Sequence, residues 1–207
     1  MSSRARRNLP RRSRRNLQPE EVRRLLAAAL DNGRFAHRNY TLILLCYRHA
    51  LRIGELSGLR WRMIDFDQKV IRVKRLNNGI DSAQPLRREE LVALRKLKRD
   101  YPGKSHLFVT RSGVPMGGRT ISRIVANAGR KAKLRIRVTP ATLRRSCGYA
   151  LAQAGHSMVA VQHYMGHRNI RHTQRYFQLP DKPFKDFWKG SGAQRRQQSR
   201  RDLALAA

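Results

Sequence analysis

This sequence of 207 residues is short of cysteine and has no long apolar run, and each shortage excludes a class of protein. Its two cysteines, Cys46 and Cys147, are too few for the disulfide framework of a small secreted domain. Both lie in apolar helical patterns, which indicate buried thiols in a reducing compartment. The apolar stretch from Thr41 to Cys46 is far shorter than the roughly 20 residues that cross a bilayer. No apolar signal-peptide segment follows the basic start. We therefore expect neither a disulfide scaffold nor a membrane protein.

Acidic side chains are also scarce, with 13 Asp and Glu against 46 Lys and Arg, so the formal charge is +33. A compact chain with this charge repels itself unless it binds a polyanion. Nucleic acid is the favoured partner, because neutralising its phosphates releases counterions. An anionic membrane surface is the less favoured alternative, since the chain offers no anchor.

Charge and composition divide the chain into three parts. Residues 1–16 hold seven arginines and no acid, which predicts a disordered basic arm. Residues 189–207 contain five more basic residues and predict a flexible basic tail. We expect one folded domain over 17–188.

Apolar periodicity within that domain predicts an α+β fold that is mainly helical and contains a small antiparallel sheet. The expected helices cover about 19–31, 36–50, a short stretch from Arg52, 91–97, 121–128, 140–154 and 158–165. Val70 to Val73 alternates like a strand, Asn77-Asn78-Gly79 is typical of a turn, and residues 83–86 can return antiparallel. A further short strand is expected over 106–109.

Two arginines stand in sequence contexts suited to binding an anion. Arg52 follows the core-facing Leu51 at the edge of a helical face, and Glu55 can hydrogen-bond and orient its planar guanidinium. Arg144 falls in the first turns of a helix that begins at Thr139-Pro140, where backbone N–H groups also attract anions. Each arginine taken alone is better explained as an ordinary solvated side chain.

The segment from Gly166 to Phe177 combines a histidine after a glycine turn with a tyrosine among basic residues. His167 can donate a hydrogen bond to a charged phosphorane-like oxygen. Tyr176 is a weak nucleophile at its ordinary pKa near ~10, and nearby arginines would lower that pKa and stabilise the phenolate. The alternatives are a core histidine and an aromatic ring packed against its neighbours. His163 and His167 are four residues apart, but Gly166 interrupts the helix, so we expect no metal site.

Taken in order, these motifs resemble those of a known enzyme family. The chain is similar to the catalytic domain of the tyrosine recombinase (phage integrase) family in three motifs: Arg52-x-x-Glu55-Leu56, Leu143-Arg144-x-Ser146-Cys147-Gly148, and Gly166-His167 followed by Tyr176. The likeness covers about 17–188. Within the family it is strongest to the short fimbrial phase-variation DNA invertases, which also lack a separate N-terminal core-binding domain.

The resemblance implies a fold, a reaction and partners. Arg52, Arg144 and His167 would bind and polarise a DNA phosphate, and Tyr176 would attack it to form a 3′-phosphotyrosyl link. The link keeps the bond energy, so no cofactor is required. Double-stranded DNA, a tetramer of the chain on DNA and DNA-bending accessory proteins are the implied partners. The apolar cluster Phe184, Phe187 and Trp188 would dock on a neighbouring protomer. The implied location is the bacterial cytoplasm, in association with the nucleoid.

Ten arginines are expected to contact DNA because they lie in the basic arm or beside Tyr176. They are Arg4, Arg6, Arg7, Arg11, Arg12, Arg14, Arg15, Arg168, Arg171 and Arg175.

The sequence departs from the family pattern at two positions. Asn77 stands where the family has a hairpin lysine that protonates the leaving 5′ oxygen, and Ala141 stands where it has a histidine. Lys74, Arg75 and Arg145 are the candidate substitutes. Loss of one general acid or base typically slows a reaction by about 10²–10⁴.

Three hypotheses therefore stay open. The first is a working recombinase, acting in DNA inversion or integration, with a rearranged acid–base set. The second is a degenerate relative that binds DNA but cleaves it slowly or not at all. The third is a basic nucleic-acid-binding protein without chemistry, which leaves the ordered set of Arg52, Arg144, His167 and Tyr176 unexplained.

Overall fold

The structure is a computed structural model that describes residues 16–31 and 33–177. The chain separates into two units, 1–176 and 177–207. The basic arm up to residue 15, the tail and the cluster Phe184, Phe187 and Trp188 lie outside the described residues.

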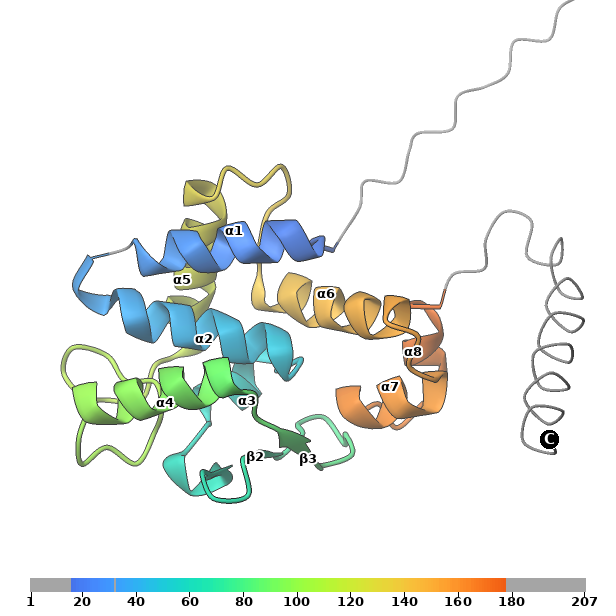
Figure 1. The fold of residues 1–207 in the computed structure, drawn as a ribbon, viewed down its shortest axis with the longest axis horizontal. Coiled ribbons are helices and arrows are strands. Elements are labelled where there is room, and N and C mark those ends of the chain that lie inside the picture. Colours follow the sequence, from blue (N-terminus) through green and yellow to red (C-terminus); the bar gives the residue numbers. More distant parts are fainter. Residues whose placement is uncertain (1–15, 32, 178–207) are drawn as a thin grey trace, which may run out of the picture. The chain divides into compact units, whose positions relative to one another are not determined.

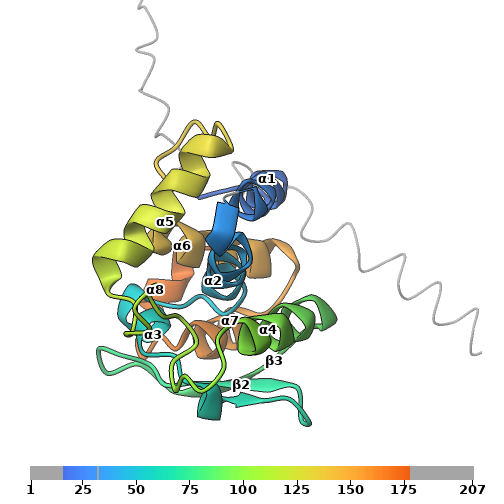
Figure 2. The same cartoon turned by 90° about the vertical axis from the view of Figure 1, so that its left-hand side faces the viewer.

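The described residues form a mainly helical domain with one small sheet (Figures 1 and 2). Its helices are α1 Pro19–Leu30, α2 Ala36–Arg48, α3 Ile53–Ser57, α4 Arg88–Asp100, α5 Gly118–Lys131, α6 Pro140–Gln153, α7 Met158–Met165 and α8 Arg171–Gln174, with short 3₁₀ turns at Gly33–Phe35 and Trp61–Met63. None of these helices has the length and apolar character needed to span a membrane.

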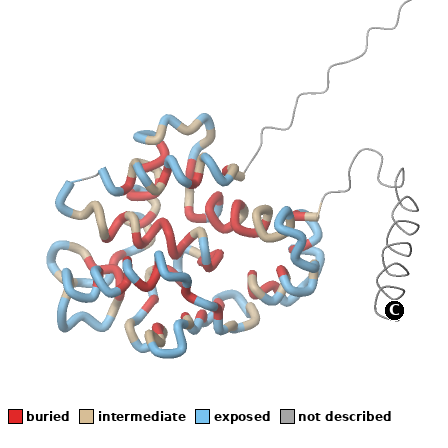
Figure 3. The backbone as a smooth tube through the Cα atoms, in the orientation of Figure 1, coloured by how far each residue is buried: buried red, intermediate tan, exposed pale blue. Residues whose placement is uncertain are grey.

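Helix α2 lies at the centre of the domain, and α1, α4 and α6 pack against it. Leu42 to Cys46 are all fully buried. Five consecutive residues point to every side of a helix, so α2 is enclosed rather than amphipathic. Figure 3 shows buried stretches along both α2 and α6. Cys46 and Cys147 are free buried thiols, as the sequence predicts.

The sheet contains the strands β1 Ile64–Asp65, β2 Val70–Val73 and β3 Ser82–Pro85, all antiparallel and in that order. Val73 pairs with Ser82, so the hairpin loop spans residues 74–81. Asn77 and Asn78 have φ values of 56° and 58°, a left-handed conformation that asparagine tolerates better than most residues. The sequence predicted this hairpin but missed β1, which is only two residues long.

Two expectations about local structure are wrong. Residues 106–109 form no strand, because their pairing is limited to the isolated bridges Arg60↔His106 and Val109↔Pro115. Arg52 lies before α3 rather than within a helix: it is the N-cap residue, with an extended backbone. Its position therefore follows from helix capping and not from a helical face.

The hairpin loop docks against the end of α7. Gly166 ends that helix with φ +63°, and Ile80 N–H donates to its carbonyl over 3.4 Å. A Cβ atom on Gly79 would lie 2.8 Å from the Gly166 carbonyl oxygen, so only glycine permits this approach. The contact brings Asn77 and Asn78 next to the segment that carries His167.

Candidate active site

Segments distant in the sequence meet around a pocket of about 520 Å³. Its lining is mostly basic and polar and comprises Arg52, Asn77, Asn78, Gly79, Ala141, Arg144, Arg145, Gly166, His167, Arg168, Asn169, His172, Arg175 and Tyr176. The four residues singled out from the sequence, Arg52, Arg144, His167 and Tyr176, are all members of this set.

Arg52 is oriented by Glu55, three residues later in α3. The Glu55 carboxylate accepts the Arg52 backbone N–H at 2.8 Å and the guanidinium Nη1 at 2.7 Å. The first contact caps the helix and the second fixes the plane of the guanidinium. The Arg52 side chain remains 26% exposed, so it is held from below and open to the pocket.

Glu55 is itself buried and accepts four hydrogen bonds. Besides the two from Arg52, it accepts Arg75 Nη1 at 2.9 Å and the Leu76 N–H at 3.1 Å. Burial alone would raise the pKa of Glu55, but the Arg52 backbone N–H and the charge of Arg75 outweigh it and hold the pKa below its usual value. Glu55 is therefore an anion at neutral pH.

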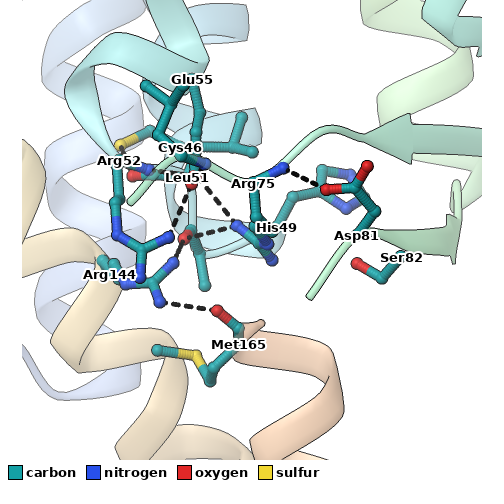
Figure 4. A network of polar contacts seen from close by, with 12 residues as sticks. Cys46, His49, Leu51, Arg52, Glu55, Arg75, Asp81, Ser82, Arg144 and Met165 are labelled. Atoms are coloured by element: carbon teal, nitrogen blue, oxygen red, sulfur yellow. Dashed lines mark hydrogen bonds and ion pairs between the residues drawn. The ribbon is translucent and has the colours of Figure 1, made fainter. Parts of the chain in front are cut away.

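Arg75 is not part of the pocket lining, and Figure 4 shows it in the polar network with Glu55 and Arg144. Its side chain is fully buried, and it donates to Glu55 and to the carbonyls of His49, Ala50 and Tyr164. Lys74 points the other way and is exposed beside a different hollow. Of the three candidate acid–base substitutes, only Arg145 lines the pocket.

Arg144 joins two turns that are distant in the sequence. Its guanidinium donates to the Ala50 carbonyl and, over 2.6 Å, to the Met165 carbonyl at the end of α7. Carbonyls at a helix C-terminus lack intrahelical partners and carry partial negative charge, so a cation there is favourable. Burial, then the charges of Arg52 and Arg75, lower the pKa of Arg144 to about 10. It still carries its charge at neutral pH.

His167 follows the glycine turn and is buried beside both arginines. Its Nδ1 lies 2.9 Å from Thr173 Oγ1, which fixes the ring. Burial, then the positive charges of Arg144 and Arg52, lower the pKa of His167 to about 3. The imidazole is therefore neutral at physiological pH.

Tyr176 is buried between α6 and His167. Its ring makes an edge contact with the Tyr149 ring, with 5.2 Å between the ring centroids. It stacks on the His167 ring, with 6.3 Å between the centroids. A Cβ atom on Gly148 would lie 2.6 Å from the ring, so this glycine makes the seat for Tyr176. Burial raises the pKa of Tyr176 more than Arg144 lowers it. Arg144 and Arg175 lower this pKa, as the sequence predicts, but burial outweighs them. The phenol therefore needs a proton acceptor as it attacks.

The remaining expected residues divide between the pocket and other surfaces. Arg168 and Arg175 line the pocket, whereas Arg171 is exposed outside its lining. Asn77 and Ala141 also line the pocket. They are the two positions at which the family pattern has a lysine and a histidine. Arg4 to Arg15 lie outside the described residues.

Sequence reasoning missed two kinds of site residue. Asn78 and Asn169 come from turns whose side-chain directions follow from the tertiary fold. His172 could have been found, because it lies only four residues before Tyr176 in the same basic segment. Among the described residues, no group of three His, Cys, Asp or Glu side chains is arranged to hold a metal ion.

Comparison with known proteins agrees with this geometry. The model of the phage integrase family matches residues 15–182. The chain belongs to that family. The type 1 fimbriae regulatory protein FimB of Escherichia coli K12 is 38% identical over 161 residues, which cover 75% of this chain and 80% of FimB. FimE of the same strain is 35% identical over 181 residues, 84% of this chain and 91% of FimE.

Solved structures share the fold. The crystal structure of XerA recombinase matches with a TM-score of 0.71 and 25% identity over 84% of this chain. The match spans 64% of the XerA chain, so this chain corresponds to a part of that recombinase. The recombinase catalytic-domain fold, mainly helical with a small antiparallel sheet, is thereby confirmed.

Proposed function

We propose that this chain is a site-specific DNA recombinase that cuts and rejoins double-stranded DNA through a 3′-phosphotyrosyl intermediate on Tyr176. The observation that carries the proposal is the convergence of Arg52, Arg144, His167 and Tyr176 on one basic pocket. Two guanidinium groups, each fixed by hydrogen bonds, suit the nonbridging oxygens of a phosphate. Membership of the phage integrase family supports the same reaction.

Each side chain has a distinct part in the reaction. Arg52 and Arg144 hold the phosphate and stabilise the charge that develops on its oxygens. Neutral His167 donates a hydrogen bond to one of these oxygens. Tyr176 attacks the phosphorus, the 5′ oxygen leaves, and the phosphotyrosine conserves the bond energy until a second 5′-hydroxyl attacks it.

The finer parts of the proposal concern the reaction outcome and the assembly. The likeness to two fimbriae regulatory proteins supports DNA inversion as the outcome over integration. Exchange of strands between two sites needs four active sites, so we propose a tetramer on DNA, with DNA-bending proteins as accessory partners. The basic arm and tail would add contacts to phosphates, and the place of action would be the bacterial nucleoid.

A trapped covalent adduct tests the proposal. Nicked duplexes from the DNA that flanks the gene are incubated with the protein, denatured and separated by size. We expect a DNA–protein adduct with the wild type and with Tyr149→Phe, which removes the hydroxyl of a neighbouring tyrosine but keeps its ring. Tyr176→Phe should abolish the adduct while DNA binding persists.

A second candidate function is supported by Asn77 and Ala141 in the pocket lining. A degenerate relative would bind the site specifically and form no adduct even at long times. Binding without any preference for a site would instead favour a basic nucleic-acid-binding protein without chemistry.

A further inference from the structure

The phenol of Tyr176 must lose its proton as it attacks, and the pocket identifies a candidate acceptor. Most of its polar lining consists of arginines and asparagines, which are poor proton acceptors: guanidinium has no lone pair to offer and an amide is very weakly basic. The lining also contains two imidazoles, His167 and His172. Histidine titrates closest to neutral pH and is the usual general base.

His167 is poorly suited to this task. Its Nδ1 is engaged with Thr173 Oγ1, and its pKa is lowered to about 3, first by burial and then by Arg144 and Arg52. An efficient base has a pKa near the working pH. The same features suit His167 to donate a hydrogen bond to the phosphate.

His172 has the placement that the task requires. It lies in α8, which ends at Gln174, two residues before Tyr176, and both side chains line the same pocket. Its ring meets the edge of the His167 ring at 6.0 Å, and the His167 ring in turn stacks on Tyr176. His172 is exposed, whereas His167 is buried.

Ala141 supplies a second observation in favour of His172. It also lines the pocket, from the first turn of α6, and its methyl group leaves space there that a larger side chain would fill. The charged groups around this space are Arg144 and Arg145 on α6, Arg52 before α3, and Arg168 and Arg175 on either side of α8. These cations stabilise a phenolate as it forms but take no proton from it.

We infer that His172 is the proton acceptor for Tyr176, an inference that rests on the proposed recombinase function. In cleavage, the Tyr176 hydroxyl proton passes to an imidazole nitrogen of His172 as the Oη–P bond forms. The P–O5′ bond breaks and the leaving 5′ oxygen takes up a proton from water. In rejoining, a 5′-hydroxyl attacks the phosphotyrosine and releases its proton to water as the P–O5′ bond forms. The P–Oη bond breaks, and His172 returns its proton to the tyrosine oxygen.

Single-turnover cleavage of the nicked duplex at saturating protein tests the assignment. We expect His172→Gln to slow adduct formation by about 10²-fold, to flatten the rise in rate with pH, and to leave DNA affinity unchanged. His163→Gln is the matched control, because His163 is an exposed histidine on α7 outside the pocket lining. Adding Ala141→His to His172→Gln should restore part of the rate, since it places a second imidazole in the same pocket.

Several results would overturn the assignment. In a substrate with sulfur at the bridging 5′ position, the leaving thiolate needs no protonation. If this substrate restores the His172→Gln rate, His172 protonates the leaving group instead. Weaker binding with an unchanged maximal rate would make His172 a DNA contact only. An unchanged rate in His172→Gln beside an active wild type refutes this inference alone, whereas a wild type that forms no Tyr176-dependent adduct refutes the proposed function as well.

Discussion

The floor and the rim of the pocket differ in how firmly the fold holds their side chains. The floor comprises Arg52, Glu55, Arg75 and Arg144. Glu55 accepts hydrogen bonds from Arg52 and Arg75, and Arg75 and Arg144 both donate to the Ala50 carbonyl. The rim comprises Asn77, Asn78, Ala141, Arg145 and His172, which come from a hairpin loop and from the ends of helices.

This difference separates two tasks of the proposed reaction. Binding and stabilising a phosphate needs charges held in place before the substrate arrives, because preorganised groups cost no reorganisation during the reaction. The floor meets that need with a buried anion, Glu55, between two arginines. Proton transfer needs a group that can change its charge, and such a group is less readily built into a buried ion network. Asn77 and Ala141, the two positions that depart from the family pattern, both belong to the rim.

Two buried glutamates allow the floor to be tested against another part of the fold. Glu55 accepts hydrogen bonds from Arg52 and Arg75. Glu90 instead bonds His49 over 2.6 Å, and neither Glu90 nor His49 lines the pocket. We expect Glu55→Gln to lower the free energy of unfolding by about 3 kcal/mol, because Arg75 then lacks its buried counter-ion, and to slow cleavage by about 10²-fold or more, because Arg52 loses its orientation. Glu90→Gln should lower stability without slowing cleavage by the folded protein.

The same variant has a pH signature, measured by chemical denaturation. The pKa of Glu55 is below its usual 4.5 in the folded protein, so its stabilising contribution is full above that pH. It is lost as the pH falls through the lower folded-state pKa. Wild type should lose this increment on acidification and Glu55→Gln should not. Equal acid sensitivity of the two proteins would contradict the ion-pair account of the floor.

The sequence predicted the floor's main arginines more readily than it predicted their surroundings. Arg52 and Glu55 are three residues apart, so their contact is local and follows from helix capping. Arg144 lies in the first turns of a helix whose proline start is visible in the sequence. Arg75 looked like a possible acid–base substitute, but it is buried because the hairpin folds under α7, a contact between segments about 90 residues apart along the chain.

The rim illustrates why the rest was harder to predict. Asn78 and Asn169 reach the pocket through turn geometry, and the docking of Gly79 on Gly166 decides where that turn lies. The strand expected over 106–109 failed for a related reason: its apolar residues are buried in the core, but the segment pairs only through two isolated bridges. Local pattern gives the elements, and long-range packing decides which side chains share a site.

Tyr176 packs against Gly148, and we expect that adding one methyl group at Gly148 will slow cleavage without weakening DNA binding. Gly148→Ala places a Cβ atom 2.6 Å from the tyrosine ring, so the ring must move. A displacement of about 1 Å at a reacting group costs about 10² in rate. We expect adduct formation to fall by this factor while DNA affinity stays constant.

The control for this prediction is Gly117→Ala, because a Cβ atom on Gly117 meets nothing within 4 Å. It should leave cleavage unchanged. Cleavage by Gly148→Ala at the wild-type rate would contradict this prediction. It would show that Tyr176 leaves its position against Gly148 when DNA binds, before it reacts.

The smallest effect is expected where the rim is rebuilt toward the family pattern. Asn77→Lys places an ammonium group in the pocket, where it can protonate the leaving 5′ oxygen. A positioned general acid contributes about 10²–10⁴, but a grafted side chain lacks supporting contacts, so we expect a gain of roughly tenfold in single-turnover cleavage. Ala141→His should add less in the wild type, because His172 already accepts the tyrosine proton. If the double variant gains nothing, the rim already contains a leaving-group acid, and Arg145 is the residue to test next. If Ala141→His alone gives the larger gain, the tyrosine proton lacks an efficient acceptor and the division of tasks between floor and rim must be redrawn.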